Sequence, residues 1–217
     1  MASPGRTSAV IFDIDGTLLD SATGIVAGFA AAIRAVGLQP PPDSVLRSDL
    51  GPPVGLFLAS LGVPEQLLPE AVAAYRSFYL QYGMQQASLY PGVDDLLHRL
   101  RQLRFPLGTA TAKRTDTALA ILVEHRLDQH FTVVNGTQGD QLSKRETITR
   151  TLELLGCTDP ATVIMVGDRH SDISGARACG VRAVAVSWGY GSSAELELAQ
   201  PDHLIHHPAG LLDLLHG

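Results

Sequence analysis

The chain has 217 residues, of which 45% are hydrophobic and 18% are charged, so it is long enough for one large domain or for a medium domain that carries a smaller one. This composition is typical of a well-packed globular protein and excludes extensive disorder. The formal net charge is -6 and no basic run occurs, which argues against a nucleic-acid-binding surface. The two cysteines lack metal-ligand spacing, and the apolar segments are too short for a signal peptide or a membrane span. We therefore expect a cytoplasmic protein with free thiols.

Residues 9–20 read AVIFDIDGTLLD, a short apolar run that ends in two carboxylates, Asp13 and Asp15. The β-forming residues of the run predict a central strand that is covered on both faces. Two carboxylates so close together repel each other unless a cation lies between them, and a hard cation such as Mg2+ would relieve that repulsion. The alternative is that the acids only cap the following turn or helix.

A second short apolar run, PLGTATAK, begins near residue 106, far beyond the roughly dozen residues that a crossover between parallel strands needs. The residues between the two runs have a helical pattern interrupted by prolines and glycines. We therefore predict an inserted helical cap domain at 20–88, and a core domain made of 1–19 and 89–217.

Beyond the second run, helical and strand patterns alternate regularly. The predicted elements are a helix at 115–127, a strand at 131–135, a helix at 144–155, a strand at 162–166, a helix at 171–179, a strand at 182–187 and a closing helix at 208–215. Alternation of this kind predicts the α/β class: a doubly wound, Rossmann-like parallel sheet covered on both faces, here with the small all-α cap inserted.

In such a sheet the carboxyl ends of the strands share one edge, where ligands bind. Polar residues follow these ends: Thr111 after the second strand, Lys144 at a helix start after the third, and Asp168 and Asp172 after the fourth. We expect the helix after Thr111 to begin beside it and to favour an anion there. The chain has two lysines, so Lys113 is the rival of Lys144.

DIDGT at 13–17, the strand of Thr111, Lys144 and GDRHSD at 167–172 resemble the four motifs of the haloacid dehalogenase-like superfamily, in order and across nearly the whole chain. The segments LYPGVDDLL at 89–97, GPP at 51–53 and SWGYGS at 187–192 further resemble its phosphoglycolate phosphatase-like branch. Ala112 departs from the pattern, since relatives often have Asn at its position.

The resemblance implies a mechanism that agrees with the chemistry of the residues. Asp13 would attack phosphorus to form an aspartyl-phosphate, and Asp15 would act as general acid and then as general base. Thr111, Lys144 and backbone amides such as that of Ala112 would hold the phosphoryl oxygens. Mg2+ would be held by the Asp13 carboxylate, the Asp15 carbonyl and Asp168. Asp172 would not contact the metal itself but would orient a water molecule or Lys144.

The expected activity is hydrolysis of a small phosphomonoester, with 2-phosphoglycolate the first candidate substrate. A nucleoside monophosphate or pyrophosphate is an alternative substrate, and a sugar phosphomutase or a non-catalytic binding module is an alternative function of the same fold. We expect a small phosphorylated metabolite as the partner, neither nucleic acid nor membrane, and a monomer or homodimer.

Overall fold

The computed structural model describes residues 7–138 and 143–215, and its centre is a parallel sheet. The strands lie in the order β4-β1-β7-β8-β9, and every neighbouring pair is parallel. Their bounds are β1 Ala9–Phe12, β4 Leu107–Thr109, β7 Val163–Gly167, β8 Arg182–Val186 and β9 His203–Ile205. Because β1 lies between β4 and β7, the ends of these three strands are neighbours, as the sequence predicted.

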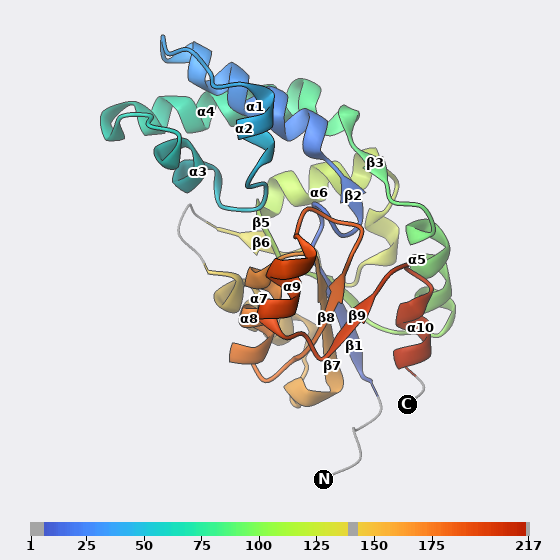
Figure 1. The fold of residues 1–217 in the computed structure, drawn as a ribbon. Coiled ribbons are helices and arrows are strands. Elements are labelled where there is room, and N and C mark those ends of the chain that lie inside the picture. The colour runs from blue at the N-terminus through green and yellow to red at the C-terminus, as the bar shows by residue number, and fades with distance from the viewer. Residues whose placement is uncertain (1–6, 139–142, 216–217) are drawn as a thin grey trace.

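Helices cover both faces of the sheet (Figure 1). Alternate side chains of β1 divide between two buried clusters: Val10 and Phe12 belong to one, and Ala9 and Ile11 to the other. The first cluster includes residues of α5 (Val93–Gln102), α6 (Thr115–Glu124) and α10 (Gly210–Leu214), and the second includes residues of α7 (Lys144–Leu155), α8 (His170–Ala178) and α9 (Ser193–Ala199). The doubly wound α/β class is thereby confirmed.

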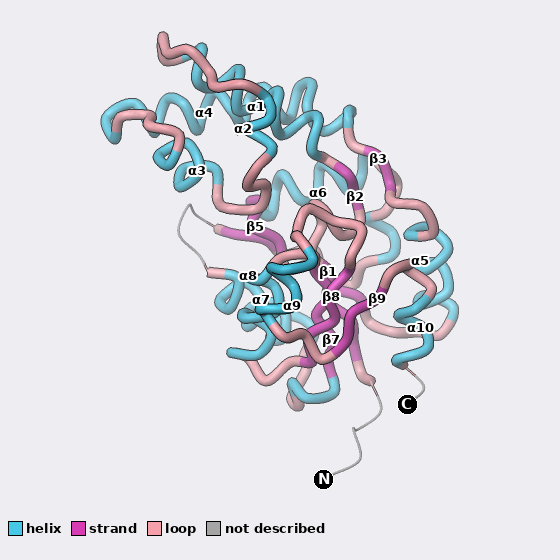
Figure 2. Tube along the Cα trace, in the orientation of Figure 1, coloured by secondary structure: helices cyan, strands magenta, loops and turns pink. Residues whose placement is uncertain are grey.

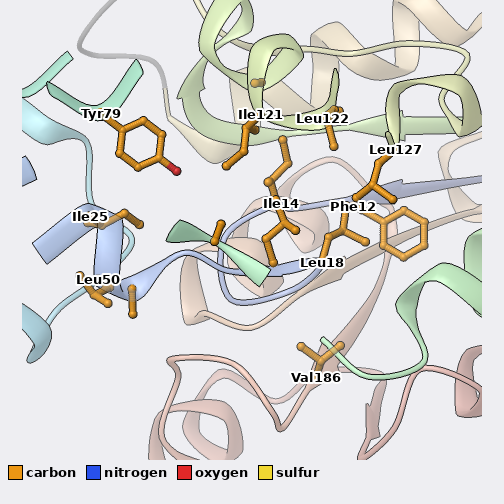
Figure 3. Packing of buried hydrophobic residues seen from close by; sticks show 14 of the residues in the cluster. Phe12, Ile14, Leu18, Ile25, Leu50, Tyr79, Ile121, Leu122, Leu127 and Val186 are labelled. Atoms are coloured by element: carbon orange, nitrogen blue, oxygen red, sulfur yellow. The ribbon is translucent and has the colours of Figure 1, made fainter. Parts of the chain in front are cut away.

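The larger cluster continues past the end of β1 toward the helical insertion. Figure 3 shows Phe12 beside Leu127, with Ile14 of the following loop close to Ile121 of α6. Leu18 of the same loop belongs to the same buried cluster. The ring of Phe12 also meets Phe131 edge to face, with centroids 6.3 Å apart. The loop that carries the acids is therefore anchored by its own apolar side chains, which fixes its path.

The insertion between β1 and β4 is helical and lies over the carboxyl edge of the sheet (Figures 1 and 2). It contains α1 (Ala22–Ala35), α2 (Asp43–Arg47), α3 (Val54–Ser60), α4 (Leu68–Phe78), a π-helical turn η2 (Tyr79–Gly83), and the 3-10 turns η1 (Glu65–Leu67) and η3 (Met84–Gln86). Strand β2 (Leu19–Asp20) pairs antiparallel with β3 (Ser88–Leu89) where the chain enters and leaves the insertion. The division at residues 19 and 89 remains our interpretation.

The prediction of a strand at 131–135 was wrong. This segment hydrogen-bonds to β4, from Thr132 N to Leu107 O over 2.8 Å and from Thr109 N to Val133 O over 3.1 Å, but only an isolated bridge forms. The backbone N–H of Asn135 donates to Thr109 Oγ1 over 2.8 Å, while its side-chain amide donates to Thr147 O and Thr151 Oγ1 of α7. The regular strand is β6 (Gly136–Thr137), which pairs with β5 (Thr111–Arg114).

Three further elements complete this half of the chain. The 3-10 turns η4 (Asp128–His130) and η5 (Pro160–Thr162) precede β6 and β7, and α9 was absent from the prediction. Ser192 caps α9 by accepting from Glu195 N over 3.1 Å, so a capping signal was present in the sequence. Within the described residues no helix is both long and apolar enough to cross a membrane.

Candidate active site

The acids of the first and fourth motifs meet at the carboxyl edge of the sheet. Asp13 directly follows β1, and its amide donates to Val166 O of β7 over 2.9 Å. Asp168 follows β7, and Asp172 lies in the first turn of α8, where its Oδ2 accepts from Arg169 N over 3.0 Å. Carboxylate oxygens of Asp13, Asp168 and Asp172 all lie within 4.8 Å of one another. The structure thus brings together three of the acids that the sequence singled out.

Close approach of the backbone makes this convergence possible. Gly16 has φ +77°, and a Cβ at this position would lie 2.2 Å from Asp168 Oδ2. A Cβ at Gly189, in the loop after β8, would lie 2.3 Å from the Cβ of Asp168. Neither position can hold a side chain without moving Asp168, so these glycines set the shape of the acidic cluster.

Burial makes the charges of these acids costly. Desolvation raises the pKa of Asp13 to about 6; Lys144 counteracts this shift, while Asp172 and Asp15 add to it. Desolvation, followed by Asp172 and Asp13, raises the pKa of Asp168 to about 8. Such shifts are expected where carboxylates share a low-dielectric site without a cation.

Lys144 lies inside the acidic cluster. Its Nζ is 2.7 Å from Asp172 Oδ1 and 3.2 Å from Asp13 Oδ2, and it donates to Ala110 O over 2.9 Å. Burial alone lowers the pKa of Lys144, but Asp13 and Asp172 outweigh it and raise the pKa above its usual value. The ammonium is therefore charged and stands next to the expected nucleophile.

Lys113 is also at the site, so both lysines lie beside the acids. Its Nζ lies 2.5 Å from Asp15 Oδ2 and 4.4 Å from the ring centroid of Tyr79 in the helical insertion. Desolvation lowers the pKa of Lys113, while Asp15 raises it, and the net shift is upward. The sequence could place the lysine after a strand but could not show where its long side chain would reach.

Thr111 is buried at the start of β5, and Ala112 lines the pocket beside it. The expectation that a helix begins directly beside Thr111 was wrong, because β5 continues to Arg114 and α6 begins at Thr115. The pairing of β5 with β6 holds this segment extended. The Thr111 hydroxyl instead accepts from Lys113 N over 3.3 Å.

Sequence reasoning missed a set of residues that hold Asp168 in place. Its Oδ1 accepts from Thr17 Oγ1 over 3.2 Å and its Oδ2 from Tyr190 N over 2.7 Å. Trp188 Nε1 in turn donates to Thr17 O over 3.0 Å. The available signal was the SWGYGS segment, which follows β8 and so had to reach the same edge of the sheet.

The residues present fit the expected Mg2+. Asp13 Oδ1 is buried and has no hydrogen-bond partner in the described part of the chain, and two more buried carboxylates lie within reach of the same point. Oxygen ligands of this charge suit a hard divalent cation. The carboxylate of Asp15 is outside this cluster and pairs with Lys113, which leaves its backbone carbonyl as the group we expect to face the metal.

A pocket lies between the acids and the helical insertion. Residues of both parts line it, including Asp15 and Lys113 from the sheet side and Asp49, Tyr75, Arg76 and Tyr79 from the insertion. Arg169 joins the two sides, because its Nη2 lies 2.8 Å from Asp49 Oδ1 and its Nη1 donates to Leu50 O. The insertion therefore covers the acids in this structure.

The sequence profile of the haloacid dehalogenase-like hydrolase family matches residues 10–186, and the chain belongs to this family. The resemblance drawn from the four motifs is thereby confirmed. The solved structure of the haloacid dehalogenase-like hydrolase SP0104 from Streptococcus pneumoniae is similar with a TM-score of 0.88 and 32% identity, covering 96% of this chain and 98% of that one.

Curated relatives carry several different names. The tyrosine-protein kinase PtkA of Mycobacterium tuberculosis is 40% identical over 88% of this chain, but the match spans only 66% of that kinase. A 5'-nucleotidase of Pseudomonas aeruginosa is 32% identical over 97% of this chain and 96% of its own length. A phosphoglycolate phosphatase of Neisseria meningitidis is 29% identical over 92% of this chain and 90% of its own length.

Proposed function

We propose that this protein is a Mg2+-dependent phosphatase that hydrolyses a small phosphomonoester, with 2-phosphoglycolate the first candidate, through an aspartyl-phosphate intermediate. The observation that carries the proposal is the assembly of Asp13, Lys144, Asp168 and Asp172 around one point at the edge of the sheet. A bound Mg2+ would supply positive charge to the phosphoryl oxygens during transfer.

The protein residues account for both steps. Asp13 forms a bond to phosphorus while the bond to the leaving oxygen breaks, and Asp15 gives that oxygen a proton. In the second step Asp15 takes a proton from water, the water oxygen bonds to phosphorus, and the bond to Asp13 breaks to release phosphate. Lys144, charged and 3.2 Å from Asp13, stabilises the negative charge of the transferring group.

The pocket supports a small anionic substrate. Arg76 and Lys113 line it beside Asp15, so a substrate with a second anionic group next to its phosphate finds positive charge there. This favours 2-phosphoglycolate or pyrophosphate over a nucleoside monophosphate or a sugar phosphate, in which the phosphate is the only anionic group. A sugar phosphate would also be the substrate of a mutase.

A panel assay tests the proposal. Phosphate release is measured from 2-phosphoglycolate, nucleoside monophosphates, pyrophosphate and sugar phosphates, with and without Mg2+, and with the Asp13→Asn variant as control. We expect metal-dependent release that Asp13→Asn abolishes, with 2-phosphoglycolate giving the highest kcat/KM. Release that survives Asp13→Asn overturns the nucleophile, isomerised sugar without phosphate indicates a mutase, and no turnover at all supports a binding module.

A second candidate function rests on the 40% identity to PtkA. The same Asp13 and Asp15 could pass a phosphoryl group from a nucleotide to a tyrosine hydroxyl instead of to water. Incubation with ATP and tyrosine-containing peptides, followed by detection of phosphotyrosine, separates the two. Phosphotyrosine that forms in the wild type and is lost in Asp13→Asn would establish the transfer to protein, whereas free phosphate alone supports the hydrolase.

A further inference from the structure

A second group of potential ligands lies on α5 and η4, away from the catalytic acids. Asp94 and His98 stand four residues apart on α5, so they share one face of the helix, and His130 ends η4 beside it. One ligand atom from each of these residues lies within 4.8 Å of the others. The rings of His98 and His130 meet edge to face, with centroids 4.6 Å apart.

His130 is the unusual member of this group. Only 5% of the residue is exposed, yet neither ring nitrogen has a hydrogen-bond partner in the described part of the chain. A buried imidazole without partners costs free energy, since both nitrogens have given up water. A bound metal ion would satisfy one nitrogen directly, which makes the unpartnered ring an independent indication of a ligand.

We propose that Asp94, His98 and His130 bind a first-row transition-metal ion, with Zn2+ the first candidate, at a site separate from the Mg2+-binding acids. Two imidazoles and one carboxylate, with water in the fourth position, are a common Zn2+ donor set. Mg2+ prefers oxygen ligands alone, so the two sites differ in the metals that they select.

The present geometry needs only a small adjustment. Ligand atoms of a tetrahedral zinc site lie about 3.3 Å apart, given bonds of about 2.0 Å. The side chains of Asp94 and His98 are 62% and 57% exposed, so both can change rotamer without disturbing the core. They already interact, with His98 Nδ1 3.3 Å from Asp94 Oδ1 and 3.0 Å from Asp94 O. Metal binding would replace that weak exposed contact.

Occupation of the site would tie α5 to η4. Helix α5 follows β3, where the chain leaves the helical insertion, and the 3-10 turn that contains His130 lies between α6 and β6. A ligand that binds only the folded chain raises the melting temperature, and this effect gives a readout that is independent of enzymatic activity.

The test uses the full chain, stripped of metal with a chelator and then saturated with Mg2+ so that the catalytic acids are occupied. Zn2+ binding is followed by calorimetry and by the melting temperature, and Co2+ binding by its visible absorption. We expect one equivalent of Zn2+ to bind with a rise of several degrees in the melting temperature, and the imidazole signals of His98 and His130 to shift in NMR spectra.

Matched variants locate the ion. Asp94→Asn and His98→Gln are expected to weaken binding at least tenfold, whereas Asp95→Asn, an exposed neighbour on α5, and His203→Gln, an exposed histidine on β9, should leave it unchanged. The variants alter exposed side chains, so loss of folding does not confuse the result. Absence of binding under Mg2+ saturation, or binding that His98→Gln leaves intact, would overturn the proposal.

Discussion

Lys113 holds one oxygen of Asp15 and leaves the other without a partner. Its Nζ lies 2.5 Å from Asp15 Oδ2, while Asp15 Oδ1 is buried and makes no hydrogen bond within the described residues. The same ammonium packs over Tyr79, whose burial the helical insertion provides. Lys113 thereby fixes the orientation of the carboxylate that we expect to exchange protons.

Replacement of Lys113 by methionine tests this arrangement. We expect kcat to fall tenfold or more for every substrate of the panel, because Asp15 loses the contact that orients it. Steady-state kinetics provide the measurement, with Arg145→Met, which removes an exposed charge from α7, as the control. An increase in KM alone, with kcat unchanged, would mean that Lys113 only attracts the substrate.

The ion pair between Arg169 and Asp49 joins the helical insertion to the sheet side of the pocket, and we expect it to favour the closed position of the insertion. Asp49→Asn removes an ion pair of 2.8 Å in which the Asp49 side chain is half exposed, so the direct effect on closure is below about 1 kcal/mol. We expect a rise of a few-fold in KM with little change in kcat, because the open form becomes more populated. Asp43→Asn, on the exposed start of α2, is the control.

Solution scattering gives a second readout for the same variant. The radius of gyration of Asp49→Asn should exceed that of the wild type without ligand and match it in the presence of Mg2+ and a phosphate analogue. Identical scattering of the two proteins in both conditions would show that this pair does not hold the insertion in place.

Much of the core could be predicted because its strands alternate regularly with helices. Strand β7 and helix α7 fall within a residue or two of their expected bounds. The prediction for 131–135 failed because β-forming residues indicate an extended chain but not its partner. The backbone N–H and carbonyl of Asn135 bond to the Thr109 hydroxyl and not to the backbone of β4. Tertiary contacts decided that element, and periodicity does not report them.

Only those parts of the site whose position follows from the direction of the strands could be predicted. Asp13, Asp168 and Thr111 follow strand ends, so the parallel sheet alone brings them to one edge. The contacts of Lys113 and Arg169 depend on where long side chains point, which no motif specifies. The group formed by Asp94, His98 and His130 was missed because its third member comes from a distant part of the chain.

The contacts of Glu195 predict a pH-dependent contribution to stability. Burial by itself raises the pKa of Glu195, but hydrogen bonds from His170 N over 2.9 Å and from Arg169 Nε over 2.8 Å outweigh it and lower the pKa to about 2. A carboxyl whose pKa is depressed on folding stabilises the protein above its unfolded pKa. That stabilisation is lost as the pH falls from about 4.5 toward 2.

Glu195→Gln should therefore lower the free energy of unfolding by about 1 kcal/mol near neutral pH, a figure reduced because 21% of the side chain remains in solvent. The difference from the wild type should shrink below about pH 4.5. Urea unfolding at several pH values measures it, with the exposed Glu197→Gln on the same helix as control. A difference that stays constant down to acid pH would exclude an electrostatic origin.

Alanine variants of Gly16 and Gly37 distinguish the cost of backbone strain from the cost of crowding at the acids. Both have positive φ, +77° and +79°, but a Cβ at Gly16 would lie 2.2 Å from Asp168 Oδ2, whereas nothing lies within 4 Å of one at Gly37.

Gly37→Ala should cost about 1 kcal/mol of unfolding free energy and leave phosphate release unchanged. Gly16→Ala should cost more than about 3 kcal/mol, because Asp168 must move, and should raise the Mg2+ concentration needed for half-maximal activity at least tenfold. Urea unfolding and a Mg2+ titration of activity measure the two effects. If the variants lose the same stability and keep the same metal requirement, the backbone at Gly16 relaxes without displacing Asp168, and its close approach does not shape the metal site.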